Sequence, residues 1–416
     1  MSDRGGPTSD RDDLDMRAIT SDEFPTFLDQ LGRAFGEGMS DEAIASERRI
    51  FELERSVAVF SSTGDMVATA GVYTFDLALP GGTESPCSGV TVVSVRQDHR
   101  RRGLLNRMMR HLLDDAVRRG EPFAALWASE GAIYGRYGFG PAVPMQRLQI
   151  PRAKLVLRDP VSTSGIEVVA PEDAPARLAP LYEAARKQRS GLLSRTEAWW
   201  HHLVVNDPPG DRDGAGPRMI AVLPDGGYVI YRLRPNWSEA SIPDGVVVVT
   251  EMISLHPEAT AALWSYVAMT DLAASVRAPV RPLDDPLAAM VVDASQVQAT
   301  SFPPMYLRIL DVAAAFEVRR YLVDDQLTFA VEDPTYPERS GTFHLEVVDG
   351  VARCEPTTDD PQLRLDTETL STVFLGGVPP STMAAARRID EQMAGAVDRL
   401  TSLLSVEAAP LQPSEF

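Results

Sequence analysis

The spacing of apolar residues predicts a first α/β region. A β-branched run at residues 91–95 predicts a buried strand. Apolar pairs then recur about every four residues from Leu104 to Val117, which is the spacing of one helix face and predicts a helix over 104–119. The neighbouring patterns predict strands at 56–60, 66–73 and 123–127 and helices that begin at Ser21 and Asp41. Together these elements would make a mixed sheet flanked by helices.

A similar order of elements resumes after residues 151–165, a segment that contains Pro, Ser and Gly and marks a boundary. There the patterns predict strands at 219–223, 227–233 and 245–254 and helices at 174–189, 197–205 and 257–269. A third region has predicted strands at 327–332, 341–348 and 351–355 and helices at 367–375 and 381–405. We expect the apolar face of the last helix to pack as core rather than to form a lipid groove. The tail at 406–416 contains two prolines and is expected to be extended.

A basic turn joins the strand at 91–95 to the helix at 104–119. It reads Arg100-Arg101-Arg102-Gly103 and stands where a helix N-terminus offers unpaired backbone N–H groups. Gly103 would let an anion approach the backbone closely, and the arginines would add charged donors. The turn lacks the Gly-Lys-Ser/Thr ending of a P-loop and the repeated glycines of a dinucleotide fingerprint. Taken alone, it fits a phosphate site and an ordinary basic surface turn equally well.

Two longer strings carry a family resemblance. They are His99-Arg100-Arg101-Arg102-Gly103-Leu104-Leu105 and the segment 128–141, which reads Ala-Ser-Glu-Gly-Ala-Ile-Tyr-Gly-Arg-Tyr-Gly-Phe-Gly-Pro. Both closely resemble the enhanced intracellular survival (Eis) family of actinobacterial GCN5-related N-acetyltransferases, and the resemblance extends over nearly the whole chain. It implies an α/β (α+β) fold class, with tandem GCN5-related acetyltransferase folds followed by a sterol-carrier-protein-like domain.

The expected domain limits combine this resemblance with the local patterns. Residues 1–15 are polar and acidic and predict a disordered leader. Residues 16–152 would form the catalytic acetyltransferase domain. Residues 153–298 would form a second, non-catalytic copy, because His256-Pro257-Glu258 stands where the first copy has its arginine-rich turn. Residues 299–416 would form the sterol-carrier-like domain with a catalytic C-terminal tail. The resemblance also implies a homohexamer.

Net charge and cysteine content limit the classes of partner, the metal content and the location that we expect for this protein. The net charge of −19 argues against nucleic acid and fits a cationic small-molecule substrate, although on charge alone acidity that serves only solubility is the better explanation. Cys87 and Cys354 form no metal-knuckle spacing or disulfide framework, so we expect no metal and a cytoplasmic location. No apolar run is long enough to span a bilayer, and no membrane partner is expected. The adjacent His201 and His202 are expected at a surface or an interface.

The resemblance implies acetyl-CoA as the co-substrate and suggests its site. Backbone groups of two strand residues would pair with the pantetheine arm as an added strand does. The pyrophosphate would lie on the basic turn, and the site would close at the end of the next strand. The residues implied are Val93, Val95, Arg100, Arg101, Arg102, Gly103, Leu104, Ser129 and Glu130.

Two residues are expected to move protons. Tyr134 would be the general acid for the leaving thiolate, because a phenol with a pKa of about 10 stays protonated at pH 7. Tyr137 is the better candidate for a packed aromatic residue. The terminal carboxylate of Phe416 would be the general base, and its intrinsic pKa of about 3.5 requires help from burial or a water relay. No cysteine lies in these motifs, so we expect direct attack in a ternary complex.

For the amine acceptor the resemblance suggests Phe24, Phe35, Glu37 and Glu415. Family members carry Asp at the position of Glu37 and a Trp near the position of Glu47, so the acceptor preference can differ. The predicted function is acetyl-CoA-dependent N-acetylation of polycationic small molecules, aminoglycosides above all, at one or several positions. The alternatives are a protein lysine or polyamine N-acetyltransferase and, from another class, a lipid or sterol carrier on an inactive scaffold.

Overall fold

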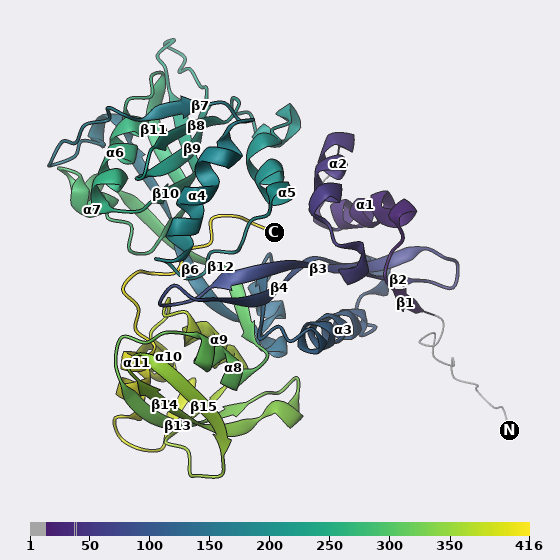
Figure 1. Cartoon of the computed structure of the whole chain (residues 1–416). Coiled ribbons are helices and arrows are strands. Elements are labelled where there is room, and N and C mark those ends of the chain that lie inside the picture. The colour runs from purple at the N-terminus through teal and green to yellow at the C-terminus, as the bar shows by residue number, and fades with distance from the viewer. Residues whose placement is uncertain (1–13, 37, 39) are drawn as a thin grey trace.

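One continuous sheet runs through the first two regions of the chain. The computed structural model describes residues 14–36, 38 and 40–416, and Figure 1 shows their arrangement. Twelve strands follow in the order β1-β2-β3-β4-β5-β12-β6-β11-β10-β9-β8-β7. Their bounds are β1 (Asp15–Arg17), β2 (Val57–Phe60), β3 (Met66–Ala78), β4 (Glu84–Val95), β5 (Phe123–Trp127), β6 (Gly140–Pro151), β7 (Glu167–Val169), β8 (Met219–Leu223), β9 (Gly227–Arg234), β10 (Gly245–Ser254), β11 (Ala273–Pro282) and β12 (Gln298–Ile309). The helices around this sheet are α1 (Phe24–Phe35), α2 (Asp41–Ile50), α3 (Leu104–Arg118), α4 (Ala174–Arg186), α5 (Glu197–Trp200), α6 (Pro257–Ala268) and α7 (Leu287–Met290).

Helices cover both faces of the first half of the sheet. α1 and α2 lie on one side of β3 and β4, and α3 lies on the other (Figure 1). Successive strand residues point to opposite faces, so β2 divides its side chains between two cores. Ala58 and Phe60 pack on the α1 side, whereas Val57 and Val59 pack on the α3 side. The helix predicted over 104–119 is confirmed, ending one residue earlier.

The second half of the sheet repeats this arrangement. Tyr182 of α4 and Ile230 of β9 lie in the core on one face, while Trp264 of α6 and Val229 of β9 lie in the core on the other. The helix predicted at 197–205 begins as α5 and then widens into a π-helical turn. Such turns are rare in proteins and frequently accompany functional sites.

Strand β12 returns from far along the chain to the sheet of the first region. It pairs with β5, with Met305 opposite Trp127, and with β6, with Leu307 opposite Gly140. We had expected residues 299–309 to begin the third region, but this segment fills the space between two first-region strands. A strand in that space satisfies the open edges of both neighbours. Local spacing carries no information on such a distant pairing.

The third region is a five-stranded sheet with helices on one face, ordered β15-β14-β13-β16-β17. The elements are α8 (Val312–Val318), β13 (Asp325–Glu332), β14 (Gly341–Val348), β15 (Val351–Thr357), β16 (Leu363–Asp366), α9 (Thr367–Phe374), α10 (Pro380–Ala385), β17 (Ile389–Glu391) and α11 (Ala396–Leu403). The ring centroid of Phe316 lies 5.2 Å from that of Phe329 and 5.5 Å from that of Phe374. The apolar face of this sheet is therefore packed as a core.

Two of the predictions need correction here. The single helix predicted at 381–405 is wrong, because left-handed backbone at Arg387 and Gly395 interrupts it and β17 lies between the two pieces. Asp15, which we expected to close the leader, begins β1, and residues 1–13 lie outside the described residues. The α/β fold class is confirmed.

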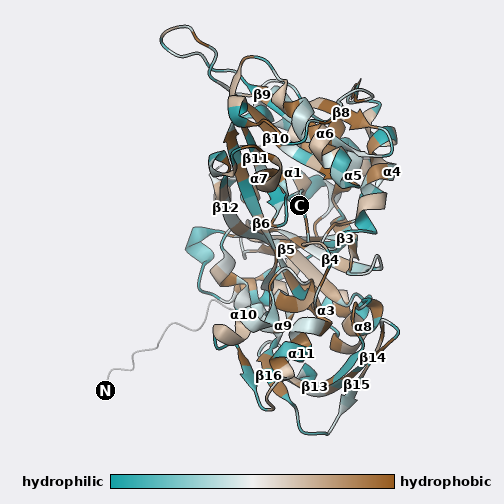
Figure 2. Cartoon of the chain, turned by 90° about the vertical axis from the view of Figure 1, so that its left-hand side faces the viewer, coloured by the Kyte–Doolittle hydropathy of each residue, from teal (hydrophilic) through white to brown (hydrophobic). Residues whose placement is uncertain are grey.

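Hydropathy follows the layers of the fold. Figure 2 shows hydrophobic segments concentrated in the central strands and polar segments in many of the outer loops. Burial of such strands between helical layers is the main favourable contribution to folding. Within the described part of the chain, no helix combines the length and apolarity needed to cross a bilayer.

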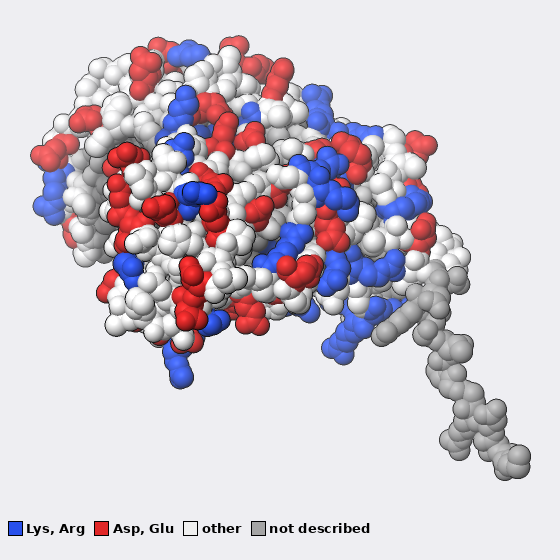
Figure 3. Space-filling model, turned by 60° about the horizontal axis from the view of Figure 1, so that its bottom comes forward, with Lys and Arg blue, Asp and Glu red and all other residues white. Residues whose placement is uncertain are grey.

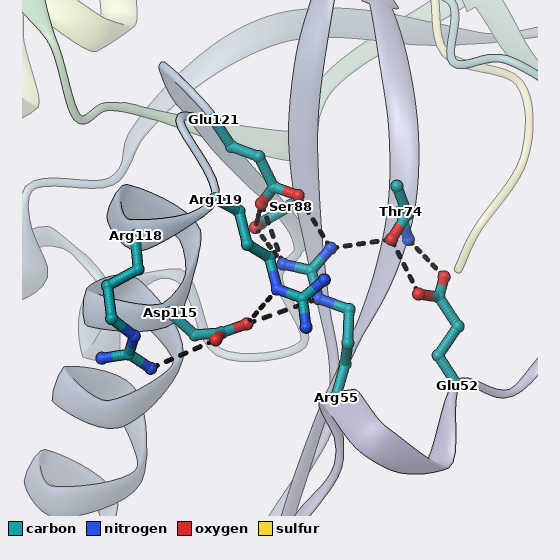
Figure 4. A network of polar contacts seen from close by, with 8 residues as sticks. All are labelled: Glu52, Arg55, Thr74, Ser88, Asp115, Arg118, Arg119 and Glu121. Atoms are coloured by element: carbon teal, nitrogen blue, oxygen red, sulfur yellow. Dashed lines mark hydrogen bonds and ion pairs between the residues drawn. The ribbon is translucent and has the colours of Figure 1, made fainter.

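A buried ion pair connects strands β3 and β4 to Glu121, which follows α3 (Figure 4). The side chain of Arg55, in the short helical turn Leu53–Arg55, is 1% exposed and donates to both carboxylate oxygens of Glu121 at 2.9 and 2.8 Å. It also donates to Thr74 of β3 at 2.7 Å and to Ser88 of β4 at 2.9 Å. One guanidinium thus fixes two strands relative to the end of α3.

We expect Arg55→Met to lower the free energy of unfolding by about 3–5 kcal/mol, because it leaves the Glu121 carboxylate buried without its cation. Urea unfolding followed by circular dichroism measures this change. Arg118→Met is the matched control, since Arg118 binds Asp115 at the exposed edge of the same network and should change stability by no more than about 0.5 kcal/mol. Equal effects of the two substitutions would contradict the importance of the buried pair.

Candidate active site

Strands β4 and β5 separate at one end of the sheet, beyond Val90 of β4 and Leu126 of β5. We call the gap between the two strands at this point the fork. They pair in parallel only from Cys87 opposite Phe123 to Val90 opposite Leu126. Beyond that point β4 continues to Val95, paired with β3 on its other edge. Its backbone groups on the β5 side are therefore open to an extended ligand, which could pair with them as an added strand does.

A β-bulge at Val92 produces this separation. Thr69 of β3 is opposite Ser94 and Gly71 is opposite Thr91, so β4 carries one more residue than β3 between these pairs. Val92 itself has a φ of 48°, which is left-handed backbone, and its carbonyl accepts a hydrogen bond of 2.8 Å from the Thr69 hydroxyl. Such a conformation costs about 1–3 kcal/mol for a β-branched residue. Bulges bend the strand that carries them, and here the bend turns β4 away from β5.

The basic turn lies beyond the end of β4 and opens α3. Gly103 is the N-cap with a φ of 80°, and it provides no side-chain cap. The first helical hydrogen bond runs from the Arg107 N–H to the Gly103 carbonyl at 3.1 Å, so the N–H groups before it have no acceptor within the helix. No atom of the described residues lies within 4 Å of the point where a Cβ of Gly103 would be. An anion can therefore reach these N–H groups, and the residues fit the pyrophosphate of a coenzyme A.

Local charge favours an anion at this end of the molecule despite the net charge of −19. Arg100, Arg101 and Arg102 are exposed on the turn, and α3 adds further arginines. Basic side chains gather toward the part of the surface where α3 lies (Figure 3). The helix N-terminus contributes a partial positive charge to the same place.

A cavity of about 410 Å³ opens at the fork, between α1, α2, α5 and the C-terminal tail. Of the residues predicted from the sequence it brings together Phe35, Val93, Ser129, Tyr134, Glu415 and Phe416. Its other lining residues are Leu28, Leu31, Gly32, Glu47, Tyr73, Val90, Thr91, Val92, Leu126, Trp127, Trp199 and His202. The end of the chain thus meets the fork inside a mostly apolar cavity.

The other predicted residues that the structure describes do not line this cavity, and the basic turn at 100–103 lies apart from it beyond the end of β4. Phe24 is 2% exposed and its ring packs against Phe51 at 5.0 Å between centroids, so it belongs to the core. The Leu104 side chain is buried in the core under α3. Val95 and Glu130 lie outside the cavity wall, and Glu130 is exposed. Glu37 lies outside the described residues.

Tyr134 lies at the junction of two short helical turns that follow β5. Its side chain lines the cavity, and burial, together with the nearby charge of Glu130, raises the pKa of its phenol above 10. The phenol therefore keeps its proton at neutral pH and can donate it. Tyr137 points elsewhere, because its hydroxyl donates to the side-chain oxygen of Asn106 on α3.

The tail reaches the cavity along the second region, to which it is hydrogen-bonded. Hydrogen bonds hold it at three residues. The N–H of Ala409 donates to the Asp284 carboxylate at 2.9 Å, the N–H of Leu411 donates to the Ser190 carbonyl at 2.9 Å, and the side-chain oxygen of Gln412 accepts from the N–H of Leu193 at 3.4 Å. The ring of Phe416 then stacks edge-on against Phe75 at 5.3 Å. A Cβ at Gly89 of β4 would lie 2.5 Å from the Phe75 ring, which is a collision, and 3.1 Å from the Phe416 ring.

Arg195 fixes the tail just before its last two residues. Its side chain donates to both carboxylate oxygens of Glu251, at 3.0 and 2.7 Å, and to the hydroxyl of Ser414. The guanidinium also lies over the ring of Tyr182, 4.1 Å from the centroid. The side chains of Arg195 and Glu251 are 3% and 10% exposed, so this anchor is a buried ion pair. The second region therefore positions the end of the tail, which belongs to the third region, at the cavity of the first.

The sequence did not identify one wall of the cavity. Glu47 of α2, Tyr73 of β3 and Trp199 of α5 line it, together with His202 of the π-helical turn. We had expected His202 at a surface or an interface, but its Nδ1 lies 2.8 Å from the Ser46 hydroxyl and its ring faces the cavity. The aromatic and histidine pairs at 199–202 were the available signal. Only the packing of α5 against α2 shows which side chains meet.

The fold and the open fork define a GCN5-related acyltransferase, and family comparisons agree. Acetyltransferase (GNAT) domain models match residues 15–142 and 191–319, and a sterol carrier protein domain model matches residues 312–412. The tandem acetyltransferase folds and the sterol-carrier-like domain are thus confirmed.

Full-length relatives extend this class to one family. An uncharacterized N-acetyltransferase of Streptomyces avermitilis is 36% identical over 97% of this chain and 99% of its own. The N-acetyltransferase Eis of Mycobacterium bovis is 30% identical over 95% of this chain and 98% of its own. The crystal structure of Eis1 from Mycobacterium abscessus superposes with a TM-score of 0.84 at 28% identity, covering 97% of this chain and all of that one. The chain belongs to the Eis family of N-acetyltransferases and is an enzyme of acetyl transfer.

Gly103→Val should weaken acetyl-CoA binding about 10- to 100-fold, because a branched side chain would cover the open N–H groups and remove charge-assisted hydrogen bonds. Isothermal titration calorimetry measures the dissociation constant. Gly120→Val is the matched control, since Gly120 has a φ of 73° and equally open space at the other end of α3. It imposes similar strain and should leave binding unchanged. Equal acetyl-CoA affinity of the two variants would show that this turn does not bind the phosphates.

Proposed function

We propose that this acetyltransferase modifies amines of polycationic small molecules, aminoglycosides in particular, at one or several positions. The observation that carries the proposal is that Tyr134 and the last residue, Phe416, line one cavity at the open fork. A cation is favoured there by the terminal carboxylate, by Glu415 and by the negative charge of the whole chain. The family's coenzyme class, an acyl-CoA, fits the fork and the basic turn.

In the proposed mechanism the chain holds both reactants and moves two protons. The backbone of Val93 and Val95 would bind the pantetheine arm, and the turn at 100–104 would bind the pyrophosphate, with Ser129 and Glu130 closing the site. The amine of the acceptor loses a proton to the Phe416 carboxylate, through a water where needed, and attacks the thioester carbonyl carbon. The carbon–sulfur bond breaks, and Tyr134 gives its proton to the departing thiolate. The products are the acetylated amine and free coenzyme A.

Two alternative functions assign the acceptor or the third region a different role. A protein lysine or polyamine acetyltransferase would use the same fork with another acceptor, so the acceptor panel below decides between them. A lipid carrier would need a cavity in the third region, whereas the apolar face of that sheet is filled by Phe316, Phe329 and Phe374. The packing therefore favours the enzyme. We also propose a homohexamer in the cytoplasm, following the family, and multi-angle light scattering tests the assembly.

Removing Glu415 and Phe416 should lower kcat about 10²- to 10⁴-fold, because the general base leaves the cavity. Thiol release from acetyl-CoA, measured with an aminoglycoside, spermidine and a lysine peptide, gives both the rate and the acceptor. Phe416→Leu is the control, since it keeps a terminal carboxylate at the same position and should retain most of the activity. Full turnover after truncation would exclude the terminal carboxylate as the base.

Tyr134→Phe should lower kcat about 10²-fold with little change in the KM for acetyl-CoA, because only the leaving thiolate loses its proton donor. Since burial raises the pKa of Tyr134, activity that depends on the protonated phenol should persist above pH 10 and fall only as the pH rises through that raised value. Tyr137→Phe removes the same hydroxyl from the neighbouring turn and serves as the control. A Tyr134→Phe enzyme with unchanged kcat would contradict the role.

A further inference from the structure

Glu47 is a carboxylate with one side bound and the other facing the cavity. Its side chain is 23% exposed, and the Tyr73 hydroxyl donates to Oε2 at 2.9 Å. Its Oε1 lies 3.8 Å from Nε2 of His202, which is beyond hydrogen-bond distance. Among the described residues no hydrogen bond to Oε1 is found. This oxygen is therefore available to a ligand in the cavity.

The groups around Glu47 leave its charge uncompensated. Burial, and then the charge of Arg218, lowers the pKa of His202 to about 4, so this imidazole is neutral at pH 7. Arg48, the next residue on α2, turns away, with its guanidinium 4.9 Å from the Phe24 ring centroid. Burial raises the pKa of Glu47, which means that water solvates its carboxylate poorly. A bound cation would supply the interaction that solvent does not.

Aromatic rings border the same carboxylate. The rings of Tyr73 and Trp199 meet edge to face, with centroids 4.9 Å apart, and the ring of His202 packs against Trp199 at 5.7 Å. An ammonium group gains from aromatic faces as well as from a carboxylate, and both contributions grow when water is excluded. A neutral ligand would lack the attraction between opposite charges, and an anionic ligand would be repelled by the carboxylate. Carboxylate and rings together therefore select a cation.

We propose that Glu47, Tyr73 and Trp199 form a subsite for an ammonium group of the acceptor that is not the one acetylated. This inference rests on the proposed function, in which the reacting amine lies between Tyr134 and Phe416. It adds that a second cationic amine of the acceptor is held against α2 while the reacting amine lies at the fork. Glu47 is then a specificity-determining residue and takes no part in proton transfer.

A measurement of amine binding without acetyl transfer tests this subsite independently of turnover. Isothermal titration calorimetry would compare spermidine with butylamine on the full chain, using Glu47→Gln, which keeps the size of the side chain and removes its charge. The native chain should bind spermidine at least 10-fold more tightly than butylamine. Glu47→Gln should weaken spermidine binding about 10- to 100-fold and leave butylamine within about 2-fold. Tyr73→Phe, which only releases the carboxylate, should show a smaller loss of about 2- to 10-fold.

The matched control is Glu42→Gln, an exposed acid on the same helix that lies outside the cavity. It removes one negative charge from the chain, as Glu47→Gln does, and should leave spermidine binding unchanged. Equal losses for Glu42→Gln and Glu47→Gln, or no preference of the native chain for spermidine, would overturn the subsite. A selective loss at Glu47 without acetylation of any amine would keep the subsite and reject the proposed function. Turnover that is selective for polyamines but does not depend on Glu47 would keep the proposed function and reject the subsite.

Discussion

The separation of β4 from β5 is the constraint on which the rest of the structure depends. A parallel pair in the middle of a sheet normally satisfies its backbone groups along its whole length. Here the left-handed conformation of Val92 forces β4 aside after Val90, at a local cost in free energy. Pairing with β3, the buried Arg55–Glu121 pair and the packing of α3 hold the strand in this position. The open backbone that results is the feature from which a coenzyme site can be built.

The second acetyltransferase-like region has the same fold as the first, but its role at the site is to hold the C-terminal tail. His256-Pro257-Glu258 stands where the first region has its basic turn, and the strands of this region instead carry Glu251, which binds Arg195 and through it the tail. The tail begins in the third region and ends at the fork of the first, with the second region as its support (Figure 1). All three regions therefore meet at one cavity, and removing any of them would leave it incomplete.

The sequence predicts what local spacing determines. The helix at 104–119 follows from its apolar stripe, and Gly120 ends it because left-handed backbone suits glycine. The break of the predicted helix at 381–405 depends on Arg387 in left-handed backbone, a conformation that its residue type does not indicate. Strand β12 and the wall formed by Glu47 and His202 arise from contacts between residues far apart in the chain. No periodicity records such contacts, so this part of the site was visible only in the structure.

A crystal structure of the chain with coenzyme A and an acceptor amine tests the central claim most directly. The fork should hold the pantetheine arm with hydrogen bonds to the backbone of Val93 and Val95, and the pyrophosphate should lie at the N-terminus of α3. The Phe416 carboxylate should lie within reach of the acceptor amine, directly or through one water. Coenzyme A bound away from the fork, or a terminal carboxylate turned out of the cavity, would contradict the proposed site.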